Sequence, residues 1–278
     1  MNFNAQKNKA VIIFAVCCLN LSNEAVVAIV NEYPLLTTDE ADEQPQELYT
    51  VAPISFWGSV QAVVWKDITL EWRTRQLLSI MVMFAVSVLV VFNFALETNL
   101  DAVRNVSTGL LWTTILLATT LGLNRTMSLE QENRSFTGVL LAPLERSALY
   151  LGKVISTLLF VLVLELILIL LFSVFFNKPF WRPGVWLVLF LGTVGYVAAG
   201  VLVASMTIQT RAREVLLPVL LLPLSLPCVL AAATGTALFM FDQLPMWTEL
   251  RSPLSLVLAY DIMMVVAGLL TYRYVVEE

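Results

Sequence analysis

Histidine is absent from the 278-residue sequence, and charged residues make up only 13% of it. Without histidine, the chain has no imidazole for acid–base catalysis and none to hold zinc or haem iron. The three cysteines, Cys17, Cys18 and Cys228, are spaced as neither a disulfide framework nor a metal knuckle. A charge content of roughly half that of soluble domains, with 59% hydrophobic residues, excludes an ordinary soluble enzyme and predicts a membrane protein.

Positive charge is not concentrated in any block of the sequence. Residues 1–60 hold two basic and seven acidic residues, and residues 61–278 hold fourteen of each. The acidity of the chain therefore belongs to its N-terminal part, and the membrane part is neutral. Because no basic block is present to bind a phosphate backbone, we expect no nucleic-acid partner.

Six apolar stretches are long enough to cross a bilayer, which takes about 20 residues. They are residues 77–96, 106–123, 154–176, 185–209, 215–241 and 254–272. The predicted fold class is therefore all-α, a polytopic membrane protein with six transmembrane helices. Lysine and arginine number ten on the side from which the first span starts and four on the other. Since cytoplasmic loops are enriched in these residues, we expect both ends of the six-span unit in the cytoplasm.

The part of the chain before the first span divides in two. Residues 57–76 have Trp57, Val60, Val64, Ile68 and Trp72 at helical spacing among charged residues, which predicts an amphipathic helix in the membrane interface. The alternative is a soluble helix beside the membrane. The acidic residues 1–56, whose composition is typical of disorder, are an unusual extension, a seventh marginal span, or the result of a start codon placed too far upstream. These three interpretations stay open.

The longest predicted cytoplasmic loop comprises residues 124–153. Its first half is polar and carries Glu130, Glu132 and Arg134, and its apolar second half ends in Leu140, Leu141, Ala142 and Pro143. Because proline disfavours helix at the residue before it, Pro143 is expected to end one helix and set the entry of the next. The pattern predicts a short amphipathic helix of the kind that a membrane subunit presents to a soluble motor. An ordinary solvated connector is the alternative.

Two carboxylates lie within the predicted spans. Glu165 is at the middle of the third span and Asp261 is nearer the start of the sixth. A charge at bilayer depth costs roughly 2.5–3.5 kcal/mol and by default faces the bundle interior or a cavity. For Glu165 we expect either a hydrogen bond to a neighbouring helix or a place along a path. For Asp261 we favour a structural hydrogen bond.

The fifth span contains Pro218, Pro223 and Pro227. Each proline removes a backbone donor and clashes one turn back, so three of them predict a kinked or broken helix. The functional interpretation is a hinge, and the alternative is a static kink set by packing. In the fourth span, Gly192, Gly195, Ala199 and Gly200 predict close helix packing.

Two runs give the chain a resemblance to a known family. They are ENRSFTGVLLAPLERSALYLGK at residues 132–153 and RAREVLLPVLLLPLSLP at residues 211–227. Together with the six-span layout and the entry helix, they resemble the haem exporter B subunit family, CcmB, over about residues 57–278. The family usually has an acid–glycine pair where this chain has Asn133 and Arg134, and residues 1–56 have no counterpart in it.

The resemblance implies an ABC-2-like permease half in the bacterial plasma (inner) membrane, and no catalytic residues. It further implies a separate ATPase subunit in a 2:2 assembly, a haem-handling membrane subunit and haem as the cargo. The ATPase-coupling surface would consist of Glu130, Glu132, Arg134, Leu140, Leu141, Ala142 and Pro143 of the long loop. The sequence has no G-x-x-x-x-G-K-[ST], so ATP is expected on the partner and no cofactor on this chain.

Three other functions are alternatives to this one. The nearest is an ABC-2 permease for another cargo, such as a lipid, a glycan or a drug. An ion-coupled carrier usually shows an internal repeat and more intramembrane polar residues, and neither is visible here. A membrane-embedded enzyme needs a convergent nucleophile, base or metal set, and the sequence predicts no catalytic or metal site.

Overall fold

The structure, a computed structural model, describes residues 56–96, 100–132, 146–176, 182–207, 210, 212–241 and 247–275. Within these ranges the chain forms α-helices and no β-strand, as the sequence predicts. The helices are α3 (Phe56–Thr74), α4 (Gln76–Leu96), α5 (Leu100–Glu132), α7 (Arg146–Phe176), α8 (Pro183–Thr207), α9 (Arg213–Phe241) and α10 (Trp247–Val275). Residues 1–55, including the N-terminal extension, lie outside the described residues.

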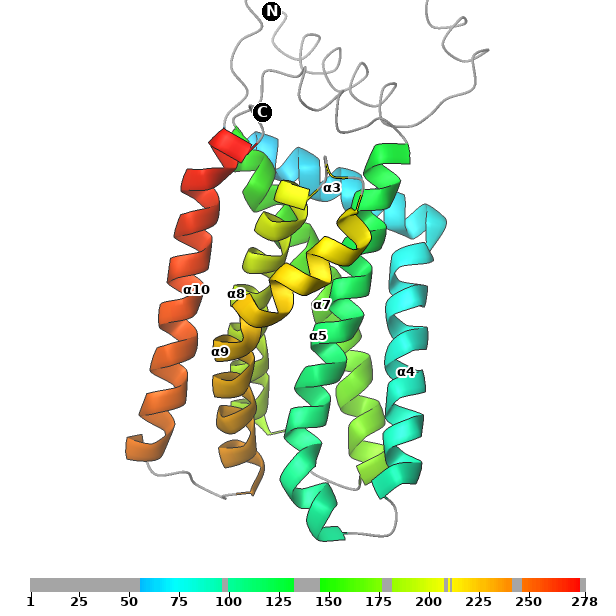
Figure 1. Ribbon diagram of the computed structural model, residues 1–278, viewed down its shortest axis with the longest axis vertical. Helices are drawn as coiled ribbons and strands as arrows, with labels where there is room; N and C mark the ends of the chain where they lie inside the picture. The colour runs from blue at the N-terminus through cyan, green and yellow to red at the C-terminus, as the bar shows by residue number, and fades with distance from the viewer. Residues whose placement is uncertain are drawn as a thin grey trace, which may run out of the picture. The chain divides into compact units, whose positions relative to one another are not determined.

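The described helices, apart from the last turn of α5, belong to one compact unit made of Ser55–Leu129 and Glu145–Glu278. Six of its helices, all but α3, are long and apolar enough to cross a membrane. This confirms the six predicted spans. Consecutive spans alternate in direction (Figure 1), so α4, α7 and α9 start at the end of the bundle that carries α3. We call this end the α3 end.

Several helices are longer than the apolar runs that predicted them, α5 and α7 among them. Helix α5 continues to Glu132, nine residues beyond the predicted end at residue 123, and α7 starts at Arg146 instead of residue 154. Hydropathy marks only the part of a helix that fits the hydrocarbon, whereas backbone hydrogen bonding continues through polar residues outside it. The predicted loop of residues 124–153 is therefore too long, since both of its ends are helical.

Helix α8 is the most enclosed of the spans. In its most apolar stretch 78% of the residues are buried, against 22% in α4. A Cβ atom at Gly192 would collide with Trp112 of α5, and one at Gly200 would collide with Leu123 of the same helix. The absence of a side chain at these glycines thus allows α5 to approach α8 closely, which confirms the close packing predicted at Gly192 and Gly200.

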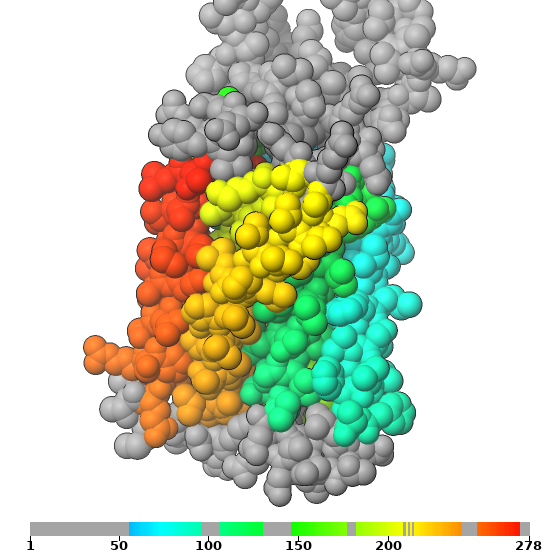
Figure 2. All heavy atoms as spheres, in the orientation of Figure 1, coloured from blue at the N-terminus to red at the C-terminus, as the bar shows by residue number. Residues whose placement is uncertain are grey.

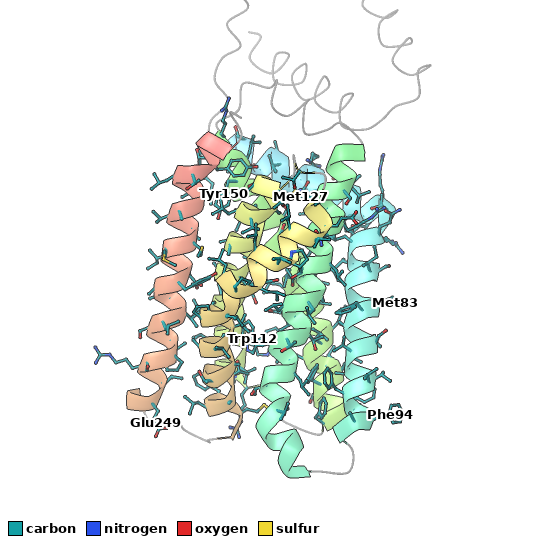
Figure 3. The ribbon with its side chains drawn as sticks, viewed as in Figure 1. Met83, Phe94, Trp112, Met127, Tyr150 and Glu249 are labelled. Atoms are coloured by element: carbon teal, nitrogen blue, oxygen red, sulfur yellow. The ribbon has the colours of Figure 1, made fainter. Side chains whose placement is uncertain are left out.

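The outer spans present apolar side chains away from the bundle. Met83 and Phe94 point outwards from α4 (Figure 3) and are 71% and 72% exposed. The first half of α9 lies at the surface of the molecule that Figure 2 shows. Its residues Val215 and Val219 are exposed. Such a surface is stable in contact with lipid rather than water.

Helix α3 lies across the α3 end and does not span (Figure 1). It occupies almost the whole segment predicted as an entry helix, residues 57–76. The predicted apolar stripe is divided between two environments. Val60 is buried against the bundle, whereas Trp57 and Trp72 are exposed. The buried face instead contains two acidic residues, Asp67 and Glu71, which the sequence pattern did not place there.

Candidate functional site

The predicted coupling residues are only partly within the described residues. Glu130 and Glu132 lie in the last turn of α5. Arg134, Leu140, Leu141, Ala142 and Pro143 lie outside the described residues. Helix α5 runs towards the α3 end, and α7 starts at that end (Figure 1). The role in coupling of the segment between them stays a prediction.

A buried ionic contact ties α3 to α7. The Asp67 carboxylate lies 3.3 Å from Lys153 Nζ of α7 and 3.3 Å from Lys66 Nζ of its own helix. Ser156 Oγ of α7 donates a hydrogen bond of 2.7 Å to Asp67 Oδ2. Burial alone would raise the pKa of Asp67, but the charges of Lys153 and Lys66 and the hydrogen bond from Ser156 outweigh it, so this pKa lies below its usual value of 3.8. Asp67 is therefore an anion held between two helices.

The backbones of α3 and α7 also come very close together beside this ion pair. A Cβ atom placed on Gly152 would lie 2.7 Å from Val63 Cβ and 3.3 Å from the Val60 carbonyl oxygen. Only glycine leaves room for this crossing. Gly152 and Lys153 are the last two residues of the run on which the family resemblance depends, and both contact the entry helix.

A second acidic residue ties α3 to the first span. The Glu71 carboxylate accepts hydrogen bonds from the backbone N–H groups of Leu77 and Leu78, at 3.2 and 2.9 Å. It therefore caps the start of α4, where N–H groups lack partners within the helix and an anion is favourable. Between the two helices Arg75 adopts a left-handed conformation with φ of 50°, and its N–H donates to the Glu71 carbonyl. The connection between α3 and α4 thus consists of a single residue, Arg75.

Tyr150 joins three spans at the same end of the bundle. It starts from α7, and its hydroxyl donates to the Ala198 carbonyl of α8 at 3.1 Å (Figure 3). The hydroxyl also lies against Gly268 of α10, where a Cβ atom would collide with it. The first turns of α7 therefore contact α3, α8 and α10. A displacement of these turns would therefore be transmitted to α3, α8 and α10 through these contacts.

The two intramembrane carboxyls lie on either side of α8. Glu165 is fully buried and accepts a hydrogen bond from Thr193 Oγ1, while its Oε2 has no partner within the described part of the chain. Asp261 is 6% exposed, and its carboxyl packs against Gly195 of α8, where a Cβ atom would collide with it. No described side chain provides a positive charge for either carboxyl, and an unpaired buried charge is costly.

Other polar side chains at this depth pair with one another. Trp112 Nε1 of α5 donates to Thr236 Oγ1 of α9 at 3.0 Å. The hydroxyls of Tyr196 and Thr120 are 2.6 Å apart, and Tyr196 also donates to the Leu116 carbonyl. These contacts could not be predicted from the sequence, because single threonines and aromatics in apolar runs carry no local signal. In the described ranges no three Cys, Asp or Glu side chains are grouped to hold a metal ion.

The three prolines lie within a continuous α9. The helix is not broken, but its first half is tilted relative to its second half (Figure 1). The Leu224 carbonyl, between Pro223 and Pro227, accepts a hydrogen bond of 3.1 Å from Tyr260 of α10. The carbonyl that loses its helical donor to Pro227 is that of the neighbouring residue, Pro223. Whether α9 hinges there stays a prediction.

Comparison with known proteins identifies one family. The sequence model of the family described as CcmB protein matches residues 59–272. The match extends from the first turn of α3 through all six spans. No curated protein matches the chain.

Proposed function

The chain belongs to the CcmB family of permease subunits in haem export for cytochrome c maturation, and we propose that it works in an ATP-driven complex with a separate ATPase subunit. We place the complex in the bacterial plasma membrane, with both ends of the six-span unit in the cytoplasm. We further propose two copies of each subunit and a haem-handling membrane partner, with haem as the cargo. The chain itself carries no P-loop, so hydrolysis takes place on the partner.

The observation that carries the coupling proposal is the convergence of helices at the α3 end. The segment between α5 and α7, with Glu130, Glu132, Arg134 and residues 140–143, would contact the ATPase. Movement of this segment displaces the start of α7. Through Lys153 and Ser156 it moves α3, and through the Glu71 cap it moves α4. Nucleotide-driven closure would thereby reach several spans without any contact between ATP and this chain.

The experiment that tests the cargo is gene deletion in the host. Membrane proteins are stained on a gel for covalently bound haem, and the b-type haem spectrum of the same membranes serves as control. We expect loss of all c-type bands with b-type haem retained, and restoration by the gene in trans. Unchanged c-type bands in a host without a duplicate gene would overturn the haem assignment and leave an ABC-2 permease for another cargo.

The experiment that tests the partner is co-purification. The chain is expressed with its candidate ATPase, and the two are tested for co-purification. Vanadate-sensitive ATP hydrolysis is then compared between vesicles that contain both subunits and otherwise identical vesicles that contain the ATPase alone. We expect the two subunits to purify together and the permease to change the hydrolysis rate. An ATPase that neither binds the chain nor responds to it would contradict the coupling proposal, whatever the cargo.

A further inference from the structure

Three tryptophans line one outward face of α3. Trp57, Trp65 and Trp72 are 71%, 71% and 79% exposed. Their spacings of eight and seven residues keep them on the same side of an α-helix, along a line of about 22 Å at 1.5 Å per residue. Three exposed indoles in a row are unfavourable in water. Tryptophan is instead enriched where protein meets the headgroup region of a bilayer, because its ring is apolar and its N–H is polar.

The charges of α3 are sorted between its two faces. Both acidic residues, Asp67 and Glu71, are buried at 7% exposure and engaged with α7 and α4. The arginines that follow, Arg73 and Arg75, are exposed. Among the described residues of α3 and its joint with α4, the outward surface therefore presents cations and indoles but no anion.

The position of this surface relative to the membrane is fixed by the first span. Helix α4 starts at Gln76, directly after Arg75, and it crosses the bilayer. Because Glu71 caps α4 and Asp67 is paired with Lys153, α3 cannot leave the plane in which α4 enters the lipid. Arg73 and Arg75 directly precede this span, in the part of the chain that leads into the headgroup region.

We propose that this surface of α3 binds the headgroups of anionic phospholipids in preference to zwitterionic ones. The indoles anchor α3 at headgroup depth, and the two arginines pair with lipid phosphates, for which a guanidinium has complementary bidentate geometry. A soluble protein is a weaker candidate for this surface, because a span that starts one residue after Arg75 places lipid beside it. The proposal does not depend on the cargo of the complex.

The binding has a consequence for the bundle. The same helix that contacts the lipid is joined through Asp67 to α7 and through Glu71 to α4. The density of anionic lipid in the leaflet would therefore bias the position of the first turns of both spans.

The test uses quenching of tryptophan fluorescence by brominated lipids. The purified full-length chain, with any subunits that co-purify, is reconstituted in equal parts of phosphatidylglycerol and phosphatidylcholine. Bromine is placed near the headgroup end of the acyl chains of one lipid or of the other. Because the chain has seven tryptophans, the same measurement on the Trp57→Phe, Trp65→Phe, Trp72→Phe triple variant is subtracted to isolate the signal of α3.

We expect brominated phosphatidylglycerol to quench the α3 signal with at least about a fivefold higher relative association constant, the worth of one arginine near an anionic surface. The Arg73→Gln, Arg75→Gln variant should lose the preference while retaining quenching. The matched control is Arg251→Gln, an equally exposed arginine of α10 that lies at the other end of the bundle and should leave the preference unchanged. In the unaltered protein, 1 M salt should also abolish the preference, because it shortens the screening length to about 3 Å.

Two results would overturn the proposal. Equal quenching by the two lipids would show that α3 does not select charge. If neither brominated lipid quenches the α3 signal, the three tryptophans face water or another protein. The salt experiment needs no substitution, so a variant that fails to fold does not remove the test.

Discussion

At the scale of single residues, the acidic side chains of the described chain fall into two groups. Asp67 and Glu71 are anions with donors around them, one paired with lysines and the other at a helix start. Glu165 and Asp261 have no ion-pair partner in the described ranges and lie within the spans. The first group is expected to depend on charge, and the second on hydrogen-bonding capacity and shape.

Removing the charge of Asp67 should destabilise the bundle strongly. Asp67→Asn leaves Lys153 buried without its carboxylate, and breaking one half of a buried ion pair typically costs about 3–5 kcal/mol. Thermal unfolding of the reconstituted or detergent-solubilised chain measures the effect. Lys66→Gln is the matched control, since Lys66 contacts the same carboxylate from a more exposed position and should cost about 1 kcal/mol or less. Equal losses in the two variants would contradict the importance of the link between α3 and α7.

The same ion pair predicts a particular dependence on pH. The pKa of Asp67 in the folded chain lies below its unfolded value of 3.8, so the folded state binds fewer protons. The stabilisation is therefore fully present above about pH 4 and is lost as the pH falls through the lower folded value. We expect the difference in melting temperature between the unaltered chain and Asp67→Asn to be constant from pH 5 to 8 and to shrink below pH 4. A difference in melting temperature that grows as the pH falls would show that the pKa of Asp67 is raised in the folded chain and not lowered.

Glu165 should tolerate the loss of its ionisable proton but not a positive charge. Glu165→Gln retains an acceptor for Thr193 and has the same shape as the neutral acid, so we expect a change within about 1 kcal/mol. Glu165→Lys places an unpaired cation at bilayer depth and should prevent stable assembly. Protease resistance in membranes compares the two. Severe loss of stability in the glutamine variant would mean that Glu165 is an anion with a partner outside the described residues.

At the scale of elements, the entry helix and α7 are joined by shape as well as by charge. Gly152→Val should force α3 away from α7, because even a Cβ atom at that position approaches Val63 to 2.7 Å. Overpacking of this kind costs about 1–3 kcal/mol, and Val63→Ala in the same chain should restore part of the loss. Gly109→Ala in α5 is the control, since its Cβ would meet nothing within 4 Å and alanine favours helix. Melting temperatures should fall for the first variant, recover in the double variant and not fall for the control.

The elements differ in how far the sequence could predict them. The six spans and the entry helix follow from long apolar runs and from tryptophans at helical spacing, and these signals are local. The extension of α5 to Glu132 is invisible to hydropathy, because its last turns are polar. The link between Asp67 and Lys153 joins residues 86 positions apart, and the Glu71 cap acts on a helix that starts five residues later. Such pairings depend on how helices meet, which a single sequence does not specify.

At the scale of the whole molecule, the described contacts at the α3 end join helices that are far apart in the sequence. Arg125 of α5 donates to Gln76 at the start of α4, the Glu71 cap joins α4 to α3, and Asp67 joins α3 to α7. Helix α8 is instead enclosed by the other helices, and side chains of its neighbours occupy the space beside its glycines. An input at one end can thus move outer helices around an enclosed central one.

That arrangement predicts that coupling can be lost without unfolding. Neither Glu132 nor Arg134 belongs to the described contacts among α3, α4, α7 and α8, so we expect the Glu132→Ala, Arg134→Ala variant to keep these contacts. We expect an unchanged melting temperature, a loss of the permease's effect on ATP hydrolysis, and c-type cytochrome reduced to the level of the deletion strain. Glu249→Gln, at the exposed start of α10 on the other end of the bundle, should behave as the unaltered chain (Figure 3). If the double variant still purifies with the ATPase and supports full cytochrome maturation, the coupling surface lies elsewhere, while the family, the six spans and the lipid-binding surface of α3 are unaffected.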